Sequence, residues 1–293
     1  MKVKANVYLL AAAVIWGFAL AAQRFGMNYI GPFTFTGVRF ALGGISLLPV
    51  IYVMTYRKRE KEKVNRDSQY SNQWIIGSVA GIILFVACSL QQIGLIYTTA
   101  GKAAFLTCLY IVLVPIVGAF LGQVIRSRSW CGSFIAIAGV YCLAVKEGWA
   151  VSYGDVLVLV GALFWTAHII FIDYYSSKID ILQLAFWQFS TCSMLSMITA
   201  AFFEEISLHS IILAAVPILY CGIGSVGIAY TLQIVGQRCV SSSHAAIILS
   251  SETIFAALGG YLFLGERLGQ QEIVGASLML AGMTVSQWQG REK

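Results

Sequence analysis

Some side chains that could take part in chemistry lie inside long apolar runs of this 293-residue sequence. Glu252 is the clearest case, because it follows about ten residues of the run 242–264 and would lie ~15 Å along a helix. That depth is near the middle of a bilayer, where an ionisable group is costly and its presence indicates a function. Such a carboxyl could accept and release a proton. The alternative is a fixed carboxyl that binds neighbouring Ser or Gln side chains or a basic group.

Aromatic and neutral polar side chains share this depth. Trp16 and Trp165 lie near the middle of their apolar runs, away from the headgroup region where tryptophan usually anchors a helix. Their rings could stack on a ring or a cation of a bound solute, or they could pack against neighbouring helices. His168 shares a helix face with Trp165 and could bind a solute or relay a proton, unless it is a structural hydrogen-bonded group. Gln91 and Tyr110 add neutral donors and acceptors. These five are candidate binding residues together with the glutamate.

A second set of candidates is assigned to coupling or gating. Glu252 belongs to it, and so do Lys102 and His244, which lie near the ends of their runs and are expected at opposite mouths of a pathway. For both, the alternative is a side chain that extends to water at a helix end. Pro115 removes a backbone hydrogen bond inside its run and could form a bendable gate, with plain packing as the alternative. For Arg39 we expect a structural role, in which the guanidinium binds carbonyls or a carboxylate where helices meet.

The composition determines which elements must position these residues. The chain is 59% hydrophobic and only 11% charged, whereas about a quarter of the residues of a soluble domain are charged. A membrane-spanning helix needs about 20 apolar residues. The sequence therefore predicts an all-α membrane protein with ten transmembrane helices, at residues 6–24, 33–56, 74–97, 100–122, 129–146, 154–175, 181–203, 211–234, 242–264 and 270–288.

Several classes of partner are not supported by the sequence. Much of the net charge of +6 comes from the segment 57–66, which is typical of a cytoplasmic loop and not of a nucleic-acid surface. The seven cysteines show no paired metal spacing, and no glycine-rich phosphate loop is present. We expect no cofactor, no metal and no nucleic acid. The oligomeric state stays open between a monomer and a homodimer.

The distribution of lysine and arginine predicts the orientation. If the N-terminus lies in the cytoplasm, most of the 19 Lys and Arg residues fall in cytoplasmic segments. We therefore expect a multi-pass protein of the cytoplasmic membrane with both termini in the cytoplasm.

An internal repeat relates the two halves of the chain. A shift of 149 residues places Trp16 on Trp165, and a shift of 142 places Lys102 on His244 and Tyr110 on Glu252. The repeat predicts a first five-helix unit over residues 1–148 and a second over 149–293. Because five is odd, the second unit enters the membrane upside down, which is the arrangement of secondary transporters.

Several motifs of the chain resemble those of a known family. The motif residues are Trp16-Gly17, Arg39-Phe40, the run 103–115 that ends at Pro115, and Ser251-Glu252 with the run 264–268 that contains Leu264-Gly265-Glu266. Together they resemble the drug/metabolite transporter superfamily, EamA type. The resemblance implies ten helices, a central cavity lined mainly by helices 1, 3, 4, 6, 8 and 9, and export of small organic solutes. Thr253 departs from the pattern, because the family often has proline there.

These observations together predict a function. We expect a secondary active transporter that exports a small amphipathic organic solute, such as an amino acid, an amine or a related metabolite, by alternating access. Its partners would be the solute, the lipid bilayer and protons that couple through Glu252. It would not be an enzyme. The alternatives are an integral-membrane enzyme and a lipid-handling or scaffold protein.

The predicted topology can be tested by labelling from one side of the membrane. A single cysteine introduced at Asn65 should react only from the cytoplasm, and one introduced at Glu147 only from outside, because an odd number of predicted spans separates them. An impermeant maleimide applied to intact cells, in a background without the native cysteines, measures this. Labelling of both positions from the same side would show that the topology is wrong.

Overall fold

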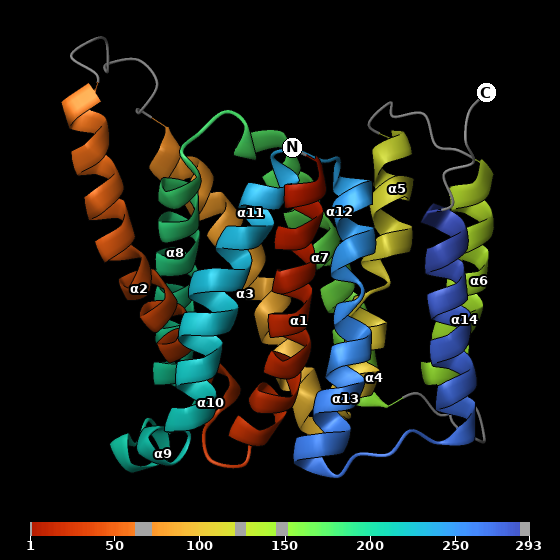
Figure 1. The fold of residues 1–293 in the computed structure, drawn as a ribbon. Helices are drawn as coiled ribbons and strands as arrows, with labels where there is room; N and C mark the ends of the chain where they lie inside the picture. The colour runs from red at the N-terminus through yellow and green to blue at the C-terminus, as the bar shows by residue number, and fades with distance from the viewer. Residues whose placement is uncertain (1, 62–71, 121–126, 145–151, 288–293) are drawn as a thin grey trace, which may run out of the picture.

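The computed structural model describes residues 2–61, 72–120, 127–144 and 152–287, and within these ranges every regular element is helical (Figure 1). The first half contains α1 (Lys2–Gly26), α2 (Pro32–Lys61), α3 (Gln73–Tyr97), α4 (Ala100–Thr107), α5 (Tyr110–Phe120) and α6 (Ser127–Ala144). The second half contains α7 (Tyr153–Ser176), α8 (Ile181–Phe203), α9 (Leu208–Leu213), α10 (Ala215–Leu219), the π-helix η1 (Tyr220–Tyr230), α11 (Thr231–Gln237), α12 (Ser242–Leu249), α13 (Glu252–Leu264) and α14 (Gln270–Gln287).

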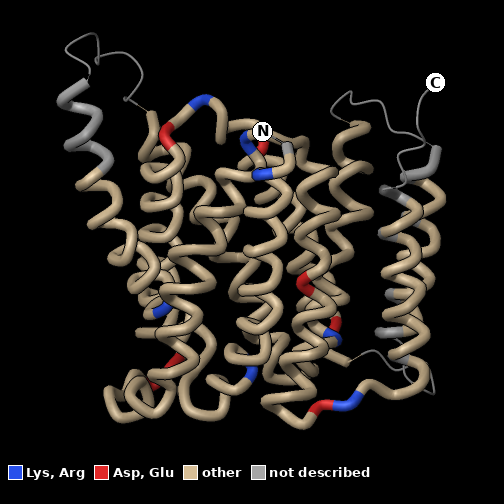
Figure 2. The backbone as a smooth tube through the Cα atoms, viewed as in Figure 1, with Lys and Arg blue, Asp and Glu red and all other residues tan. Residues whose placement is uncertain are grey.

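The helices have the length and composition of membrane spans. Eight segments of the described chain are long and apolar enough to cross a bilayer, while α6 and α14 carry shorter apolar stretches, Trp130–Gly139 and Ile273–Gly282. Charged residues lie mostly at the two ends of the bundle, with few between them (Figure 2). The predicted all-helical membrane fold is confirmed.

The two halves have the same order of helices and opposite directions. α1 and α7 begin at opposite ends of the bundle, and so do α4 and α12 (Figure 1). α1 begins and α14 ends at the same end (Figure 1). The fold is therefore two inverted five-helix repeats, as the sequence predicts.

The fourth and ninth predicted spans are not continuous helices, contrary to expectation. A turn at Cys108 and Leu109 separates α4 from α5, and a turn at Ser250 and Ser251 separates α12 from α13. The sequence shift of 142 residues places the first turn on the second. Pro115 lies inside α5, so the interruption comes before the proline and not at it.

Local hydrogen bonds satisfy much of the backbone at the second break. Ser250 Oγ donates to the carbonyl of Ile247 at 2.6 Å, and Ser251 Oγ donates to that of Ile248 at 2.7 Å. Thr253 Oγ1 donates to the carbonyl of Ser250 at 2.9 Å. Two of these carbonyls, those of Ile248 and Ser250, also accept backbone N–H groups at 3.2 and 3.1 Å, so the break is bonded within the protein, where lipid could supply no partner.

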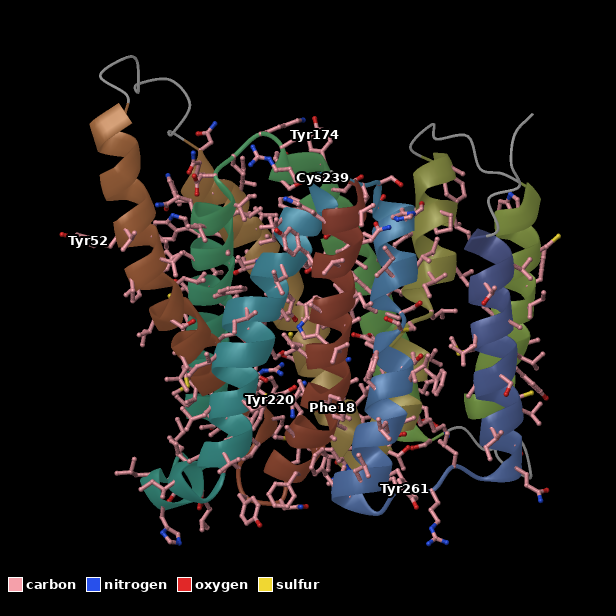
Figure 3. The ribbon with its side chains drawn as sticks, in the orientation of Figure 1. Phe18, Tyr52, Tyr174, Tyr220, Cys239 and Tyr261 are labelled. Atoms are coloured by element: carbon pink, nitrogen blue, oxygen red, sulfur yellow. The ribbon has the colours of Figure 1, made fainter. Side chains whose placement is uncertain are left out.

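The eighth predicted span also differs from a plain α-helix. It consists of α10, the 11-residue π-helix η1 and α11, and η1 packs on α1 and α2. Tyr220 at the start of η1 donates from its hydroxyl to the carbonyl of Ile15 on α1 at 3.1 Å. On the other side of α1, Phe18 packs against Phe255 and Phe263 of α13 (Figure 3). Helix α1 is therefore held between the two elements that carry the irregular backbone.

Glycines allow α6 and α14 to pack closely. A Cβ atom at Gly139 would lie 2.6 Å from the carbonyl oxygen of Gly275, and one at Gly282 would lie 2.6 Å from that of Gly132. The two contacts are reciprocal between the helices that end each half. Any side chain at either position forces the helices apart.

Gly282→Ala should lower the stability of the protein, although alanine normally stabilises a helix relative to glycine by up to ~1 kcal/mol. The added Cβ would meet backbone atoms of α6 at 2.6 Å, and overpacking of this kind costs about 1–3 kcal/mol. Thermal unfolding in detergent measures the change.

Gly44→Ala is the matched control, because its Cβ would meet only Phe189 Cβ at 3.9 Å, an ordinary contact. An equal melting temperature for both variants would contradict the close packing of α6 and α14.

Candidate functional site

A small cavity lies at the centre of the bundle and is lined from both halves. It has a volume of about 40 Å³, which is room for roughly three water molecules. Its lining comes from α1, α2, α3, α4, α5, α7, η1, α11, α12 and α13, and consists of Trp16, Leu20, Gln23, Arg39, Gln91, Thr107, Tyr110, Trp165, Ile169, Ser225, Tyr230, Gln233, Leu249 and Glu252. All six spans implied by the family resemblance contribute, and α2 adds Arg39.

Three aromatic rings form one wall of this cavity. Tyr230 lies between the two tryptophans, with its ring centre 4.7 Å from that of Trp16 and 6.3 Å from that of Trp165. Trp16 Nε1 donates to the carbonyl of Ser225 at 3.1 Å, whereas Trp165 Nε1 is buried without a hydrogen-bond partner. The wall offers flat apolar faces and one unused donor to a bound molecule.

The only acidic side chain in the described lining is Glu252, the first residue of α13. It is 6% exposed, and Cys108 Sγ lies 3.5 Å from its Oε1. Within the described ranges Glu252 forms no ion pair with a Lys, Arg or His side chain. The start of a helix favours a negative charge there, while removal from water disfavours it. Two opposing effects therefore act on the charge of this carboxyl.

Its repeat-related position, Tyr110, is the first residue of α5 and lines the same cavity. Cys108 Sγ lies 3.6 Å from Tyr110 Oη and 3.8 Å from the carbonyl oxygen of Ser250. Because Cys108 and Ser250 are themselves related by the repeat, the two broken helices cross at their breaks. The cavity therefore surrounds the point where the two halves meet.

The remaining expected binding residues are placed differently. Gln91 lines the cavity and donates from Nε2 to Thr107 Oγ1 at 2.9 Å. His168 is fully buried behind Trp165, with its Nε2 3.0 Å from Gln188 Oε1 on α8, and it is not among the lining residues. Two further residues, Tyr230 and Gln233, also line the cavity.

Lys102 forms a buried ion pair at one end of the bundle. Its Nζ lies 2.8 Å from Asp155 Oδ2, and both side chains are at most 5% exposed. Thr98 Oγ1 donates to Asp155 Oδ1 at 2.8 Å. The ammonium group is therefore paired inside the protein. The alternative interpretation of Lys102, a side chain that extends to water, does not describe this arrangement.

His244 forms a corresponding contact at the opposite end. Its Nε2 lies 3.0 Å from Asn6 Oδ1. The repeat places Lys102 on His244 and Asn6 on Asp155, so the two pairs occupy equivalent positions in the two halves. The sequence analysis missed Asp155 and Asn6, because each looks like an ordinary polar residue in the first turn of a helix. The signal that could have found them is the shift of 149 residues, which places the polar residue Asn6 on the polar residue Asp155.

A larger cavity lies at the Lys102 end of the bundle. Its volume is about 460 Å³, and it shares no lining residue with the central cavity; its walls include Arg24, Asn28, Tyr97, Thr98, Thr99, Lys102, Ser152 and Glu266. The Glu266 carboxylate accepts the backbone N–H of Ala100 at 3.0 Å and so caps α4 beside Lys102. The central cavity is therefore separate from this outer space.

Comparison with known proteins identifies the family. The sequence profile of the EamA-like transporter family matches residues 3–145 and, a second time, residues 152–287. The chain belongs to the EamA-like transporter family. A relative from Archaeoglobus fulgidus, described as an uncharacterized transporter, is 30% identical over 97% of this chain and 86% of its own length. The protein is accordingly a membrane transporter and not an enzyme.

More distant relatives agree with this assignment. The uncharacterized transporter YoaV of Bacillus subtilis is 22% identical over 96% of both chains. A solved crystal structure superimposes with a TM-score of 0.73 at 17% identity and covers 98% of this chain and 97% of that chain. At this identity the structure supports the fold alone.

The two end pairs, Lys102–Asp155 and His244–Asn6, should differ sharply in strength. Asp155→Asn leaves the Lys102 ammonium buried without a counter-charge, and we expect a loss of about 3–5 kcal/mol in the free energy of unfolding. His244→Gln removes one side of a partly buried hydrogen bond that has no counter-charge and should cost about 1 kcal/mol. Denaturant unfolding of the purified protein in detergent measures both.

The double variant Lys102→Gln with Asp155→Asn is the control for this comparison. Because it removes both charges together, it should be more stable than the sum of the two single losses predicts. Strictly additive losses would show that the two side chains do not interact.

Proposed function

We propose that this EamA-family protein is a secondary active transporter that exports a small amphipathic solute across the cytoplasmic membrane by alternating access. The observation that carries the proposal is the central cavity at the crossing of two broken helices, one from each inverted half. Discontinuous helices in inverted repeats characterise the binding sites of secondary transporters. In this arrangement, exchange of conformation between the halves would open the site first to one side and then to the other.

The end pairs are suited to control that exchange. The Lys102–Asp155 and His244–Asn6 pairs are both formed in this structure, while the central cavity holds only a few water molecules' volume. This combination corresponds to a state closed at both ends. Opening one end would separate the pair at that end and leave the other intact. Because one pair joins two opposite charges and the other joins a histidine to an uncharged amide, the two openings would have different energetic costs.

We propose that Glu252 couples transport to protons. It lines the cavity without a cationic partner in the described chain, so it can exchange a proton for a cationic group of the solute. In an exchange cycle, the deprotonated carboxylate binds a solute cation from the cytoplasm. After the solute leaves on the outside, the carboxylate takes up a proton there and releases it inside. One proton would enter for each solute exported.

The cavity chemistry supports an amphipathic solute with an amine, such as an amino acid, an amine or a related metabolite. Aromatic rings and Leu20, Ile169 and Leu249 supply apolar contacts, while Glu252 supplies the acid. A phosphorylated solute would need several cationic side chains, and Arg39 is the only one in the described lining.

Glu252→Gln should abolish accumulation of solute that is driven by a pH gradient and should retain exchange of solute for solute. The amide keeps the shape of the side chain but cannot release a proton at any physiological pH. Uptake by purified protein in liposomes, without nucleotide, measures both activities, with an imposed pH gradient for one and preloaded solute for the other.

Glu205→Gln is the control variant, because Glu205 is exposed and lies outside the cavity. It should behave as the wild type in both assays. Gradient-driven accumulation by Glu252→Gln at the wild-type rate would rule out the coupling role. A wild-type protein that moves no solute in either assay would favour a lipid-handling or scaffold function instead.

A further inference from the structure

Arg39 is a buried permanent charge in the membrane-spanning part of α2. Its side chain is 3% exposed and lines the central cavity together with Glu252. A guanidinium group remains protonated in proteins, so it cannot avoid the cost of burial by losing its proton. A charge buried at this depth is expensive unless a partner compensates for it.

The structure does not provide that partner within the described residues. Arg39 forms no ion pair there, and its side-chain hydrogen bonds go to the thiols of Cys88 and Cys221. Its Nε is buried and unpaired. The guanidinium carbon lies 5.7 Å from the ring centre of Phe35 and 5.2 Å from that of Phe40. The structural role expected from the sequence, in which Arg39 binds carbonyls or a carboxylate of the protein, is therefore not what the structure shows.

Neither the phenylalanine rings nor the two thiols offer an oxygen acceptor to the N–H donors of Arg39. A cation above an aromatic face is stabilised by the electrons of the ring. Such a contact offsets part of the cost of burying the charge, but it supplies no oxygen acceptor to the N–H donors. A planar fork of donors matches the two oxygens of a carboxylate.

We infer that Arg39 is the residue of the central site that binds the carboxylate of the solute. This inference rests on the proposed function and narrows it, because a solute that satisfies both charges of the cavity is a zwitterion. Its carboxylate would bind Arg39, its ammonium group would bind Glu252, and its side chain would contact the aromatic wall. Simple amines would satisfy only half of the site.

The surroundings favour a single carboxylate over a more highly charged anion. Arg39 is the only cationic side chain in the described lining, and Glu252 in the same cavity would repel a second negative charge. Trp165 Nε1 and Gln233 Oε1 are buried without partners, so the site also has neutral groups available for the solute. An α-amino acid with an apolar side chain matches this set of groups.

The experiment compares ligands that differ only at the carboxylate. The probes are L-phenylalanine and L-leucine, their amides, and the corresponding amines phenethylamine and isopentylamine. Calorimetry on the full-length wild-type protein in lipid nanodiscs measures their affinities. We expect each amino acid to bind about 10- to 100-fold more tightly than its amide or amine, the range for a charged hydrogen bond.

Variants then assign the difference to Arg39. Arg39→Gln should lower amino-acid affinity by the same factor and leave amide and amine affinity unchanged, and Arg39→Lys should give an intermediate loss because it keeps the charge without the fork. Arg267→Gln, at an exposed position in the segment between α13 and α14, should change nothing.

The other possible outcomes of the ligand comparison distinguish the role of Arg39 from the proposed class of solute. Equal affinity of the wild type for acids and amides would overturn the role of Arg39 but leave the proposed transport of amines intact. Failure of the wild type to bind or move any probe would overturn the proposed class of solute as well. If Arg39→Gln does not fold, the ligand series on the wild type still decides the question.

Discussion

The need to satisfy backbone hydrogen bonds in the middle of a bilayer is the constraint on which this structure depends. Two helices are interrupted there, at Cys108–Leu109 and at Ser250–Ser251. Freed carbonyls would be unacceptable in lipid. The interruptions are therefore placed in the interior, in contact with each other, and three hydroxyl groups bind carbonyls at the second. The positions of the cavity and of α1 beside α13 and η1 follow from this crossing.

The repeat gives the two halves one backbone plan, while the side chains at equivalent positions differ. Tyr110 begins α5 where Glu252 begins α13, so only one of the two equivalent sites carries a carboxyl group. An ion pair lies at one end where a histidine–asparagine hydrogen bond lies at the other. The fold supplies the symmetry that alternation needs, and the side chains supply the difference between the two sides.

The fold and part of the site could be predicted from the sequence because they depend on strong patterns. Apolar run length predicts the spans, and the repeat brings Trp16, Trp165, Tyr110 and Glu252 to one depth. The helix breaks could not be predicted in the same way, since cysteine and serine also occur within regular helices. Proline would have marked the second break in the sequence, but this chain has Thr253 where the family often has proline. The Thr253 hydroxyl binds the Ser250 carbonyl at the break. That Arg39 has no ion-pair partner in the described chain depends on three-dimensional packing that no local pattern records.

The reciprocal glycine contacts of α6 and α14 have a consequence for energy differences along the transport cycle. If the halves exchange conformations, the contact of Gly139 with Gly275 and that of Gly282 with Gly132 exchange roles. Their combined energy is then the same in the inward-open and outward-open states and cancels from the equilibrium between them. Substitutions in this helix pair would change how much protein is folded without changing which way it faces. Control of direction must lie where the halves are chemically unequal.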